Sequence, residues 1–324
     1  MNIPEIINEL TSTITLADLV LLAAGVSLLA YWLVKTSFGR TALIDSPPRR
    51  NNMPLYLPFV PLLFFFGVYT LADSTRQYLA HDLPDWQSAF LDNLFLCVAG
   101  IVTMLITILL ARSTFARRLK GFGLDPRTIP KDIFAAFLNL LAVWPLLLFM
   151  IVATIFFGKL IYGSDFEMPQ HEELVEIMAN PQLSLRILIA VTTIAVMPPL
   201  EEMLFRGMFQ TAVRSFLEAR FSTHRPPESL EPQSPQSPFT NHQLPFTDNQ
   251  LPITIHQSPN TAWLAIAITS ALFATIHANP PHWPALFVLS ISIGYAYEKS
   301  GSLFRPIFIH ALFNATSVIS VLNQ

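Results

Sequence analysis

The sequence is poor in charged residues and contains a single cysteine. Of its 324 residues, 13% are charged and 52% are hydrophobic, and the mean hydropathy is +0.48. So little charge excludes an ordinary soluble globule and indicates a polytopic membrane protein. Cys97 alone can form neither an internal disulfide nor a cysteine-rich metal site, and we expect it to serve packing. The net charge of −3, without a dense basic cluster, gives no reason to expect a nucleic-acid partner.

A basic segment at the N-terminus is also missing. No Lys or Arg precedes Lys35, so the chain lacks the basic region of a signal peptide, and its first apolar run should remain as a membrane span. The first four apolar runs are long enough to cross a bilayer, which takes about 20 residues. The runs cover 16–34, 55–72, 94–111 and 133–158, a fifth span starts near Arg186, and shorter segments follow at 262–277, 285–297 and 303–322. The sequence therefore predicts an all-α, polytopic integral membrane bundle of about eight transmembrane or membrane-embedded helices.

The composition divides the chain into three regions. Residues 1–184 should form an N-terminal membrane region of four spans, and 185–221 together with 261–324 should form a second, catalytic membrane core. Between these two parts, 222–260 is rich in Pro, Gln, Ser and Thr and contains a seven-residue repeat. Such a segment has too little apolar surface to offset its ordering entropy, so we expect a disordered insertion. The alternative is a docking site for a partner.

The connecting loops alternate in charge. The loops after the first and third spans, 35–50 and 112–131, are basic, whereas those after the second and fourth, 73–92 and 159–186, are acidic. By the positive-inside rule the basic loops are cytoplasmic and the N-terminus lies outside. The fifth span then runs inward, and we expect it to carry Glu201 toward the cytoplasmic side.

Two adjacent carboxylates and an arginine follow the apolar run 187–196. On a helix, Glu202 and Arg206 stand at i and i+4, with the acid first, which is the better order for an ion pair. Glu201 lies about 100° round the helix and has no such partner. Because ionisable residues at membrane depth are costly, function is their default interpretation. The pattern predicts one neutralised carboxylate and one left free for chemistry, although the start of an amphipathic surface helix would give the same pattern.

The last apolar segments hold the other polar groups. Phe273 and His277 lie one turn apart, and so do His310 and Asn314. The proline-rich stretch 278–284 joins two short segments and predicts a helical hairpin whose tip is buried in protein or lines a cavity. Simple counting of spans places His277 far from Glu201 and His310, so such a hairpin or a deep cavity is needed to bring them together. A lone buried histidine usually serves packing, but these groups together cost burial energy unless they satisfy one another.

These residue types suit the activation of water. A carboxylate beside an imidazole can take a proton from water, while imidazole and amide N–H groups can stabilise an oxyanion. No serine or cysteine belongs to the motifs, so a covalent acyl intermediate lacks an obvious nucleophile. The indicated reaction is direct hydrolysis of an amide.

The three motifs resemble, in type and order, those of the CPBP family of intramembrane endopeptidases. This family includes the type II CAAX prenyl proteases and bacterial proteins linked to bacteriocin processing or self-immunity. The resemblance covers roughly 187–322 and rests on Glu201-Glu202-x-x-x-Arg206, Phe273-x-x-x-His277 and His310-x-x-x-Asn314.

The resemblance implies roles for these residues. Glu201 and His277 would activate the water, and His310 and Asn314 would form the oxyanion hole. Glu202, Arg206 and Phe273 would be support residues. No cofactor is implied. The partners would be a peptide or protein substrate and the bilayer, and we expect the bacterial inner (plasma) membrane as the location.

Two alternatives stay open. One is a zinc-dependent membrane protease with Glu201, His277 and His310 as ligands, although no His-Glu-x-x-His pair supports it. The other is a non-catalytic immunity or transport protein that uses the polar cluster for binding. The sequence does not identify the substrate, and both a CAAX-type tail and a bacteriocin or leader peptide fit the resemblance.

Overall fold

The computed structural model describes residues 15–47, 49–79, 83–221 and 259–322. These residues form helices joined by short connections, with one isolated backbone bridge between Asn51 and Phe115. The expected all-α architecture is confirmed. The expected disordered insertion, 222–260, lies almost entirely outside the described residues.

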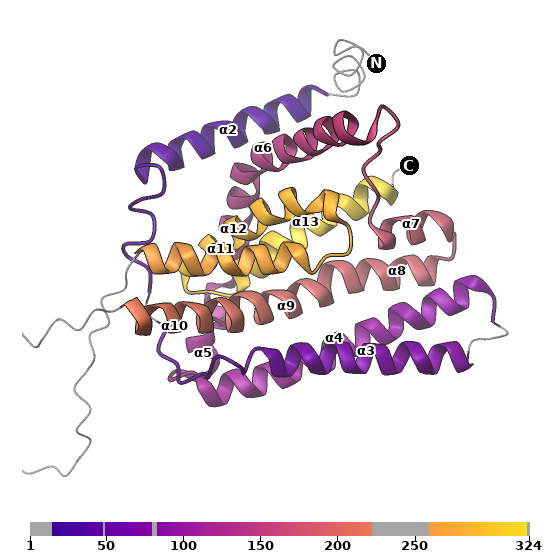
Figure 1. The fold of residues 1–324 in the computed structure, drawn as a ribbon, viewed down its shortest axis with the longest axis horizontal. Helices are drawn as coiled ribbons and strands as arrows, with labels where there is room; N and C mark the ends of the chain where they lie inside the picture. Colours follow the sequence, from indigo (N-terminus) through magenta and orange to yellow (C-terminus); the bar gives the residue numbers. More distant parts are fainter. Residues whose placement is uncertain (1–14, 48, 80–82, 222–258, 323–324) are drawn as a thin grey trace, which may run out of the picture.

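Five helical segments among the described residues are long and apolar enough to cross a membrane. Three other helices, α3 (Phe59–Leu79), α11 (Pro259–Thr275) and α12 (Trp283–Ser300), run alongside them (Figure 1). Together they match the expected polytopic bundle of about eight membrane helices. The five segments are α2 (Leu16–Lys35), α4 (Asp85–Thr114), α6 (Ile129–Tyr162) with its preceding turn, the continuous run Leu183–Phe221, and α13 (Phe304–Leu322).

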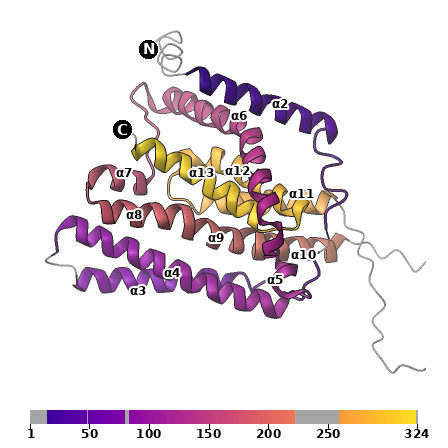
Figure 2. The ribbon, with the colours of Figure 1, turned by 180° about the vertical axis from the view of Figure 1, so that it is seen from behind.

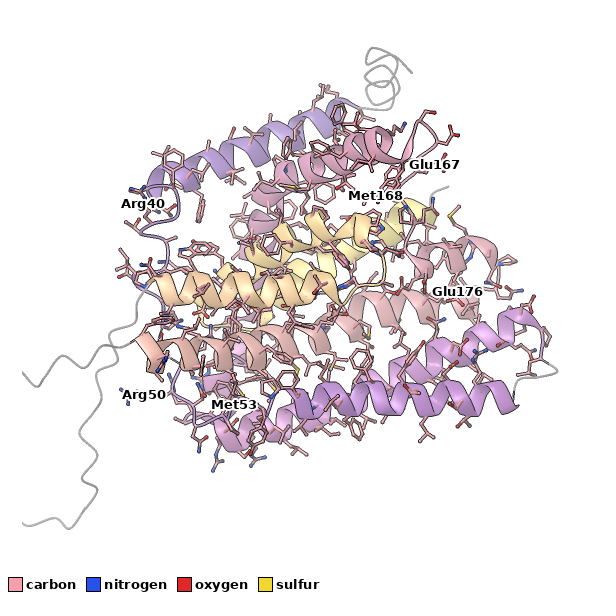
Figure 3. The ribbon with its side chains drawn as sticks, viewed as in Figure 1. Arg40, Arg50, Met53, Glu167, Met168 and Glu176 are labelled. Carbon is pink, nitrogen blue, oxygen red and sulfur yellow. The ribbon has the colours of Figure 1, made fainter. Side chains whose placement is uncertain are left out.

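The connections gather at two opposite ends of the bundle, as both views show (Figures 1 and 2). In Figure 3, Arg40 and Arg50 mark one end, whereas Glu167 and Glu176 mark the other. We call these the basic end and the acidic end. Short helices lie at each: α5 (Arg118–Phe122) at the basic end and α7 (Glu172–Ala179) at the acidic end. The alternation of charge predicted from the loops is thus present in the fold.

The run Leu183–Phe221 forms the centre of the bundle. It comprises α8 (Leu183–Val191), a π-helical segment (Thr192–Val196), α9 (Met197–Glu202), a second π-helical segment (Met203–Gln210) and α10 (Thr211–Phe221). Pro198 and Pro199 lack backbone donors, which accounts for the interrupted hydrogen-bond ladder before the carboxylates. Residues 200–221 thus continue the fifth span beyond the two prolines.

Close packing surrounds this central run. Every residue of Met203–Gln210 is buried. Gly207 lies against the ring of Phe122, so that a Cβ at this position would overlap the ring. The absence of a side chain at Gly207 therefore lets α5 and the α4–α6 connection approach the central run. On the other side, α12 and α13 pack on α6 through a core that includes Leu140, Ile293 and Ile309.

Helices α11 and α12 form the hairpin predicted from the sequence (Figure 1). A 3₁₀ turn, Pro280–His282, lies at its tip. The tip is covered by protein, because the His282 ring nitrogen Nε2 lies 2.8 Å from the carbonyl oxygen of Pro169, and the rings of His282 and His171 stack with centroids 4.3 Å apart. The segment between α6 and α8 thus closes over the end of the hairpin, which meets the condition for a non-spanning turn at membrane depth.

Candidate active site

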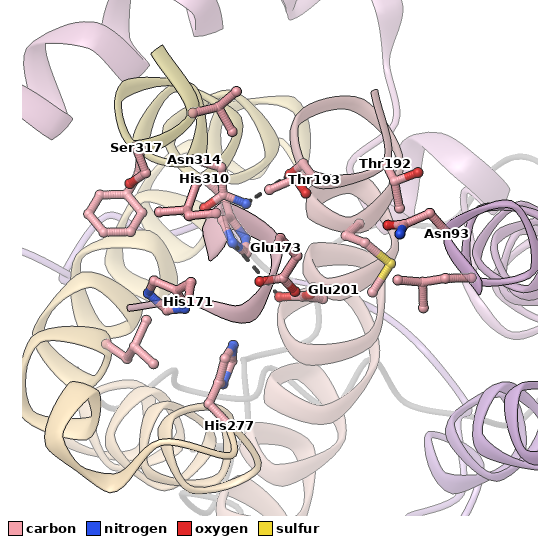
Figure 4. Close-up of a pocket in the computed structure, with 16 residues that line it drawn as sticks. Asn93, His171, Glu173, Thr192, Thr193, Glu201, His277, His310, Asn314 and Ser317 are labelled. Atoms are coloured by element: carbon pink, nitrogen blue, oxygen red, sulfur yellow. Dashed lines mark hydrogen bonds and ion pairs between the residues drawn. The ribbon is translucent and has the colours of Figure 1, made fainter. Parts of the chain in front are cut away.

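One cavity of about 140 Å³ brings the three motifs together (Figure 4). Its walls include Glu201 from α9, His277 from the hairpin tip, and His310 and Asn314 from α13. The short hairpin is what places His277 here, since its tip turns back inside the bundle. The convergence of these four side chains, expected from the motifs, is therefore present in the structure.

The predicted ion pair between Glu202 and Arg206 lies just behind this cavity. Glu202 Oε1 accepts a hydrogen bond from Arg206 Nη1 at 3.0 Å, and the two residues are 0% and 1% exposed. Arg206 Nη2 also donates to Ser290 Oγ at 2.7 Å, and its guanidinium lies 4.7 Å from the centroid of the Phe273 ring. A buried arginine needs such partners to remain charged, so this group is held in one place.

The same carboxylate orients His310. The distance between His310 Nδ1 and Glu202 Oε1 is 2.8 Å, and because a carboxylate oxygen accepts, Nδ1 must carry a proton. The other ring nitrogen, Nε2, then lies 3.8 Å from Glu201 Oε2. Glu202 therefore connects the arginine to the imidazole, which the i,i+4 pattern alone does not reveal.

Glu201 differs from its neighbour in lacking the hydrogen bonds that Glu202 Oε1 accepts from Arg206 and His310, although Oε2 of Glu202 is also buried without a hydrogen bond among the described residues. Within the described part of the chain, Oε2 of Glu201 is buried and accepts no hydrogen bond. The residue as a whole is half-buried and lines the cavity. Of the two carboxylates, Glu202 is thus the one paired with an arginine, as the i,i+4 spacing predicted.

The tautomer of His277 follows from its backbone contact. Nδ1 lies 2.7 Å from the carbonyl oxygen of Phe273, so Nδ1 carries a proton and donates. In the neutral ring, Nε2 is then an acceptor. The Phe273 ring packs against His277 at 4.8 Å and against His310 at 5.8 Å between centroids, and it thereby separates and supports both imidazoles.

Asn314 is held by the central run. Its Nδ2 donates to the carbonyl oxygen of Thr193 at 2.9 Å. Thr193 lies in the π-helical segment Thr192–Val196, where the altered ladder frees a backbone carbonyl to accept this bond. One of the two amide N–H groups of Asn314 is thereby used, and the second is available to the cavity.

The sequence did not single out several residues of the cavity wall. His171 and Glu173 come from the segment between α6 and α8, and Asn93 comes from α4. Asn93 Nδ2 donates to Glu176 Oε2 at 2.7 Å and so ties α7 to α4. The only signal in the sequence was the polar pair His171-Glu172 at the start of a short amphipathic helix, and it did not indicate where that helix docks.

The expectation that the fifth span carries Glu201 toward the cytoplasmic side stays a prediction, and the fold shows the depth of Glu201 in the bundle. Glu201 lies near the middle of the 39-residue run Leu183–Phe221, and its cavity is completed by His171 and Glu173 from the acidic end. The run starts at Leu183 and continues far beyond Glu201 before it reaches the basic end. The carboxylate thus faces a cavity toward the acidic end of the bundle.

The stacked rings of His171 and His282 join the acidic segment to the hairpin tip. Burial lowers the pKa of His171, an effect that nearby His277 increases and Glu173 opposes. Burial, followed by the charge of His171 and of His277, lowers the pKa of His282, while the hydrogen bond to Pro169 opposes this. A histidine whose pKa is lowered by folding contributes stability at pH values above its ordinary pKa of about 6.5. This contribution decreases as the pH falls below 6.5, and it is lost once the pH has fallen through the lowered pKa of the folded state.

The ligands of the zinc alternative would be Glu201, His277 and His310, which belong to the same cavity. Within the described ranges, no group of three or more His, Cys, Asp or Glu residues is placed so that it could hold a metal ion. Glu201, His277 and His310 as they stand therefore do not fit a zinc ion.

The fold and the cavity define a polytopic membrane protein with a polar site enclosed by apolar helices. A family model described as type II CAAX prenyl endopeptidase Rce1-like matches residues 182–316, a range that contains all three motifs. This match confirms, for 182–316, the resemblance drawn from the motifs. No curated protein and no solved structure matches the chain. The Rce1-like domain supports a CAAX-type intramembrane protease, and so a hydrolase, and the apolar helices support an integral membrane protein.

Proposed function

We propose that the protein is an intramembrane endopeptidase that hydrolyses a peptide bond with a water molecule activated by Glu201. The observation that carries the proposal is the single cavity lined by Glu201, His277, His310 and Asn314. These side chains come from separate helical elements, and packing alone gives no reason for them to converge inside an apolar bundle. A polar cluster in an enclosed pocket is instead the arrangement expected of a catalytic site.

Glu201 and His277 are the proposed proton acceptors. Oε2 of Glu201 carries no hydrogen bond from the described residues, and Nε2 of neutral His277 is an acceptor. A water molecule held between them would lose a proton to Glu201 as its oxygen attacks the carbonyl carbon. The proton would then pass to the amide nitrogen as the C–N bond breaks. No covalent intermediate with the protein is required.

His310 and Asn314 are the proposed oxyanion donors. Since Nδ1 of His310 already donates to Glu202, Nε2 can donate only when the ring carries both protons. The Glu202 carboxylate provides the negative charge that such a ring needs in a buried position. The second amide N–H of Asn314 would complete the pair of donors, fixed in place before the reaction by the bond to Thr193.

Glu202, Arg206 and Phe273 are the proposed support residues. They touch the proposed catalytic groups rather than the cavity, because Glu202 holds His310 and Phe273 packs on both imidazoles. Arg206 fixes Glu202 in turn.

We propose that the protein lies in the bacterial inner membrane, with the basic end of the bundle in the cytoplasm and the N-terminus outside. The partners are the bilayer and a peptide or protein substrate at the membrane, and the candidate substrates are a CAAX-type tail or a bacteriocin or leader peptide.

The proposal is tested by comparing peptide N-termini in membranes that contain wild-type protein or Glu201→Gln, both at equal folded yield. New termini present only with the wild type support hydrolysis, whereas identical termini in the two samples favour a non-catalytic binding protein. Chelation separates the zinc alternative: cleavage that is abolished by a chelator and restored by zinc would establish metal dependence.

A further inference from the structure

A buried polar network joins the central run to α12. Its members are spaced four residues apart on each side: Arg206, Gln210 and Arg214 on the run, and Ser290, Gly294 and Glu298 on α12. Each residue of the run is bonded to the residue 84 positions later, so the two helices are parallel and all three pairs belong to one register. We call these three pairs the polar interface.

Gln210 lies at the centre of the polar interface. Its Nε2 donates to the carbonyl oxygen of Gly294 at 3.2 Å and to Glu298 Oε1 at 2.9 Å. Gln210 and Glu298 are both 0% exposed, and Glu298 also pairs with Arg214. A Cβ at Gly294 would lie 2.8 Å from Gln210 Oε1, so the missing side chain lets α12 approach the run this closely.

Stability alone gives no reason for charged groups in this place. Moving an ion pair out of water carries a large desolvation cost, and apolar residues of similar volume are often at least as stabilising. Buried polar groups, however, are satisfied only when donors and acceptors face each other. A shift of α12 by one residue along the run would break all three pairs at once. The polar interface therefore favours a single register.

The register of α12 matters to the active site at two places. At the start of the helix, Trp283 Nε1 donates to the carbonyl oxygen of His277 at 2.9 Å, so α12 holds the hairpin tip that carries a proposed proton acceptor. Further along, α12 binds Arg206, which fixes the carboxylate that orients His310. Both imidazoles of the motifs therefore depend on where α12 lies along the run.

We propose that Gln210 is a positioning residue for the hydrolysis: with the other pairs of the polar interface, it fixes the register of α12 on the central run. That register places His277 and His310 relative to Glu201. Gln210 does not line the cavity as described, so it acts through α12 and not on the substrate. The inference rests on the proposed function and adds to it a residue remote from the reacting atoms.

The first test uses Gln210→Met in the full-length protein, purified in detergent. Methionine fills a similar volume but donates no hydrogen bond. Cleavage of a quenched membrane peptide should show kcat lowered by about tenfold or more, because small displacements of catalytic groups are costly, while KM stays near the wild-type value. A fall in melting temperature with a wild-type kcat would show that the polar interface serves the fold alone, and it would overturn the proposal.

The second readout is independent of turnover. In protein with isotope-labelled histidine, NMR detects the Nδ1–H groups of His277 and His310, which donate to the Phe273 carbonyl and to Glu202. Each signal is identified by its loss in the corresponding His→Gln variant. Both signals should shift in Gln210→Met. Unshifted signals would contradict a positioning role.

Ser290→Ala is a milder second variant. It removes the hydroxyl that accepts from Arg206 Nη2 and leaves the rest of the polar interface in place. We expect a smaller fall in kcat than in Gln210→Met, and a shift of the His310 signal. Because both changes act through one contact surface, the double variant should lose less than the product of the single losses. Losses that multiply fully would show that the two residues act separately.

Glu218 offers a matched control. Its Oε1 accepts a hydrogen bond from Arg214 Nε at 2.9 Å, but this contact lies within α10 and does not reach α12. Glu218→Gln therefore removes a carboxylate beside the polar interface without changing the register, and kcat and both signals should stay at the wild-type values. Equal effects in Glu218→Gln and Gln210→Met would refute the specific role of Gln210.

The two readouts separate this inference from the proposed function. If the wild-type protein cleaves no peptide, hydrolysis itself fails. The imidazole signals then still decide whether Gln210 positions His277 and His310, since they report the geometry of the site and require no turnover.

Discussion

The adjacent residues Glu201 and Glu202 allow one substitution to be compared at two positions with different surroundings. Glu202 is fully buried, and its Oε1 accepts hydrogen bonds from both Arg206 Nη1 and His310 Nδ1. The Glu202→Gln variant can keep an oxygen at this place, so both hydrogen bonds can persist. What it loses is the negative charge opposite a buried guanidinium.

The loss of stability expected in Glu202→Gln follows from the loss of this negative charge. Removing one partner of a buried ion pair costs about 3–5 kcal/mol, because the other charge is left uncompensated. Since the hydrogen bonds to Oε1 can be kept, we expect the lower end, about 3 kcal/mol, and a fall in Tm on the order of 5 °C or more. Glu201→Gln breaks no pair with an arginine, because the closest ionisable contact of Glu201 in the described structure is His310 Nε2, 3.8 Å from its Oε2. It should melt at or above the wild-type temperature.

The assay is thermal unfolding of the purified proteins in one detergent, followed by tryptophan fluorescence and by loss of soluble protein. Glu201→Gln is the control for the substitution itself. If Glu202→Gln melts with the wild type, the Glu202–Arg206 pair does not support the fold. If Glu201→Gln is the less stable of the two, the assignment of one structural and one free carboxylate is wrong.

Three further predictions follow from the site and its covering segment. His310→Ala and Asn314→Ala should each lower kcat by roughly a hundredfold to a thousandfold. The loss of kcat in the double variant should be smaller than the product of the two single losses, because both donors serve one oxygen. A wild-type kcat for Asn314→Ala would contradict this role. The protection of the backbone amides of 163–171 from hydrogen exchange should decrease as the pH falls below about 6.5, because protonation places two positive charges on the stacked rings of His171 and His282. Equal protection at pH 7.5 and pH 5 would show that protonation does not weaken this contact. Replacing 222–260 by a short Gly/Ser linker should leave yield and cleavage near wild type, because a segment of this polar, proline-rich composition offers little apolar surface for packing. Loss of membrane-inserted protein would show that the segment is structural.

Much of the fold was accessible from the sequence because its signals are local. Apolar runs of sufficient length identify membrane helices without knowledge of their neighbours. The i,i+4 spacing predicted the pair Glu202–Arg206, since helix geometry alone brings those side chains together. Three prolines between short apolar segments predicted the hairpin that carries His277.

The parts that were missed depend on contacts between distant segments. His282 and Pro169 are 113 positions apart, and no periodicity indicates that the acidic segment docks on the hairpin tip. The depth of Glu201 within the bundle could not be predicted for a related reason. The loop charges give the direction of a span but not the depth at which a residue lies or which elements close the cavity around it.

The central claim is that Glu201 activates the water. Its most direct test is the rate at which purified wild-type protein and Glu201→Gln cleave one quenched membrane peptide, with equal amounts of folded protein confirmed by thermal melting. The account predicts that kcat falls by about a hundredfold or more in Glu201→Gln, because glutamine cannot accept the proton, while the melting temperature does not fall. Cleavage by Glu201→Gln at the wild-type rate would contradict it.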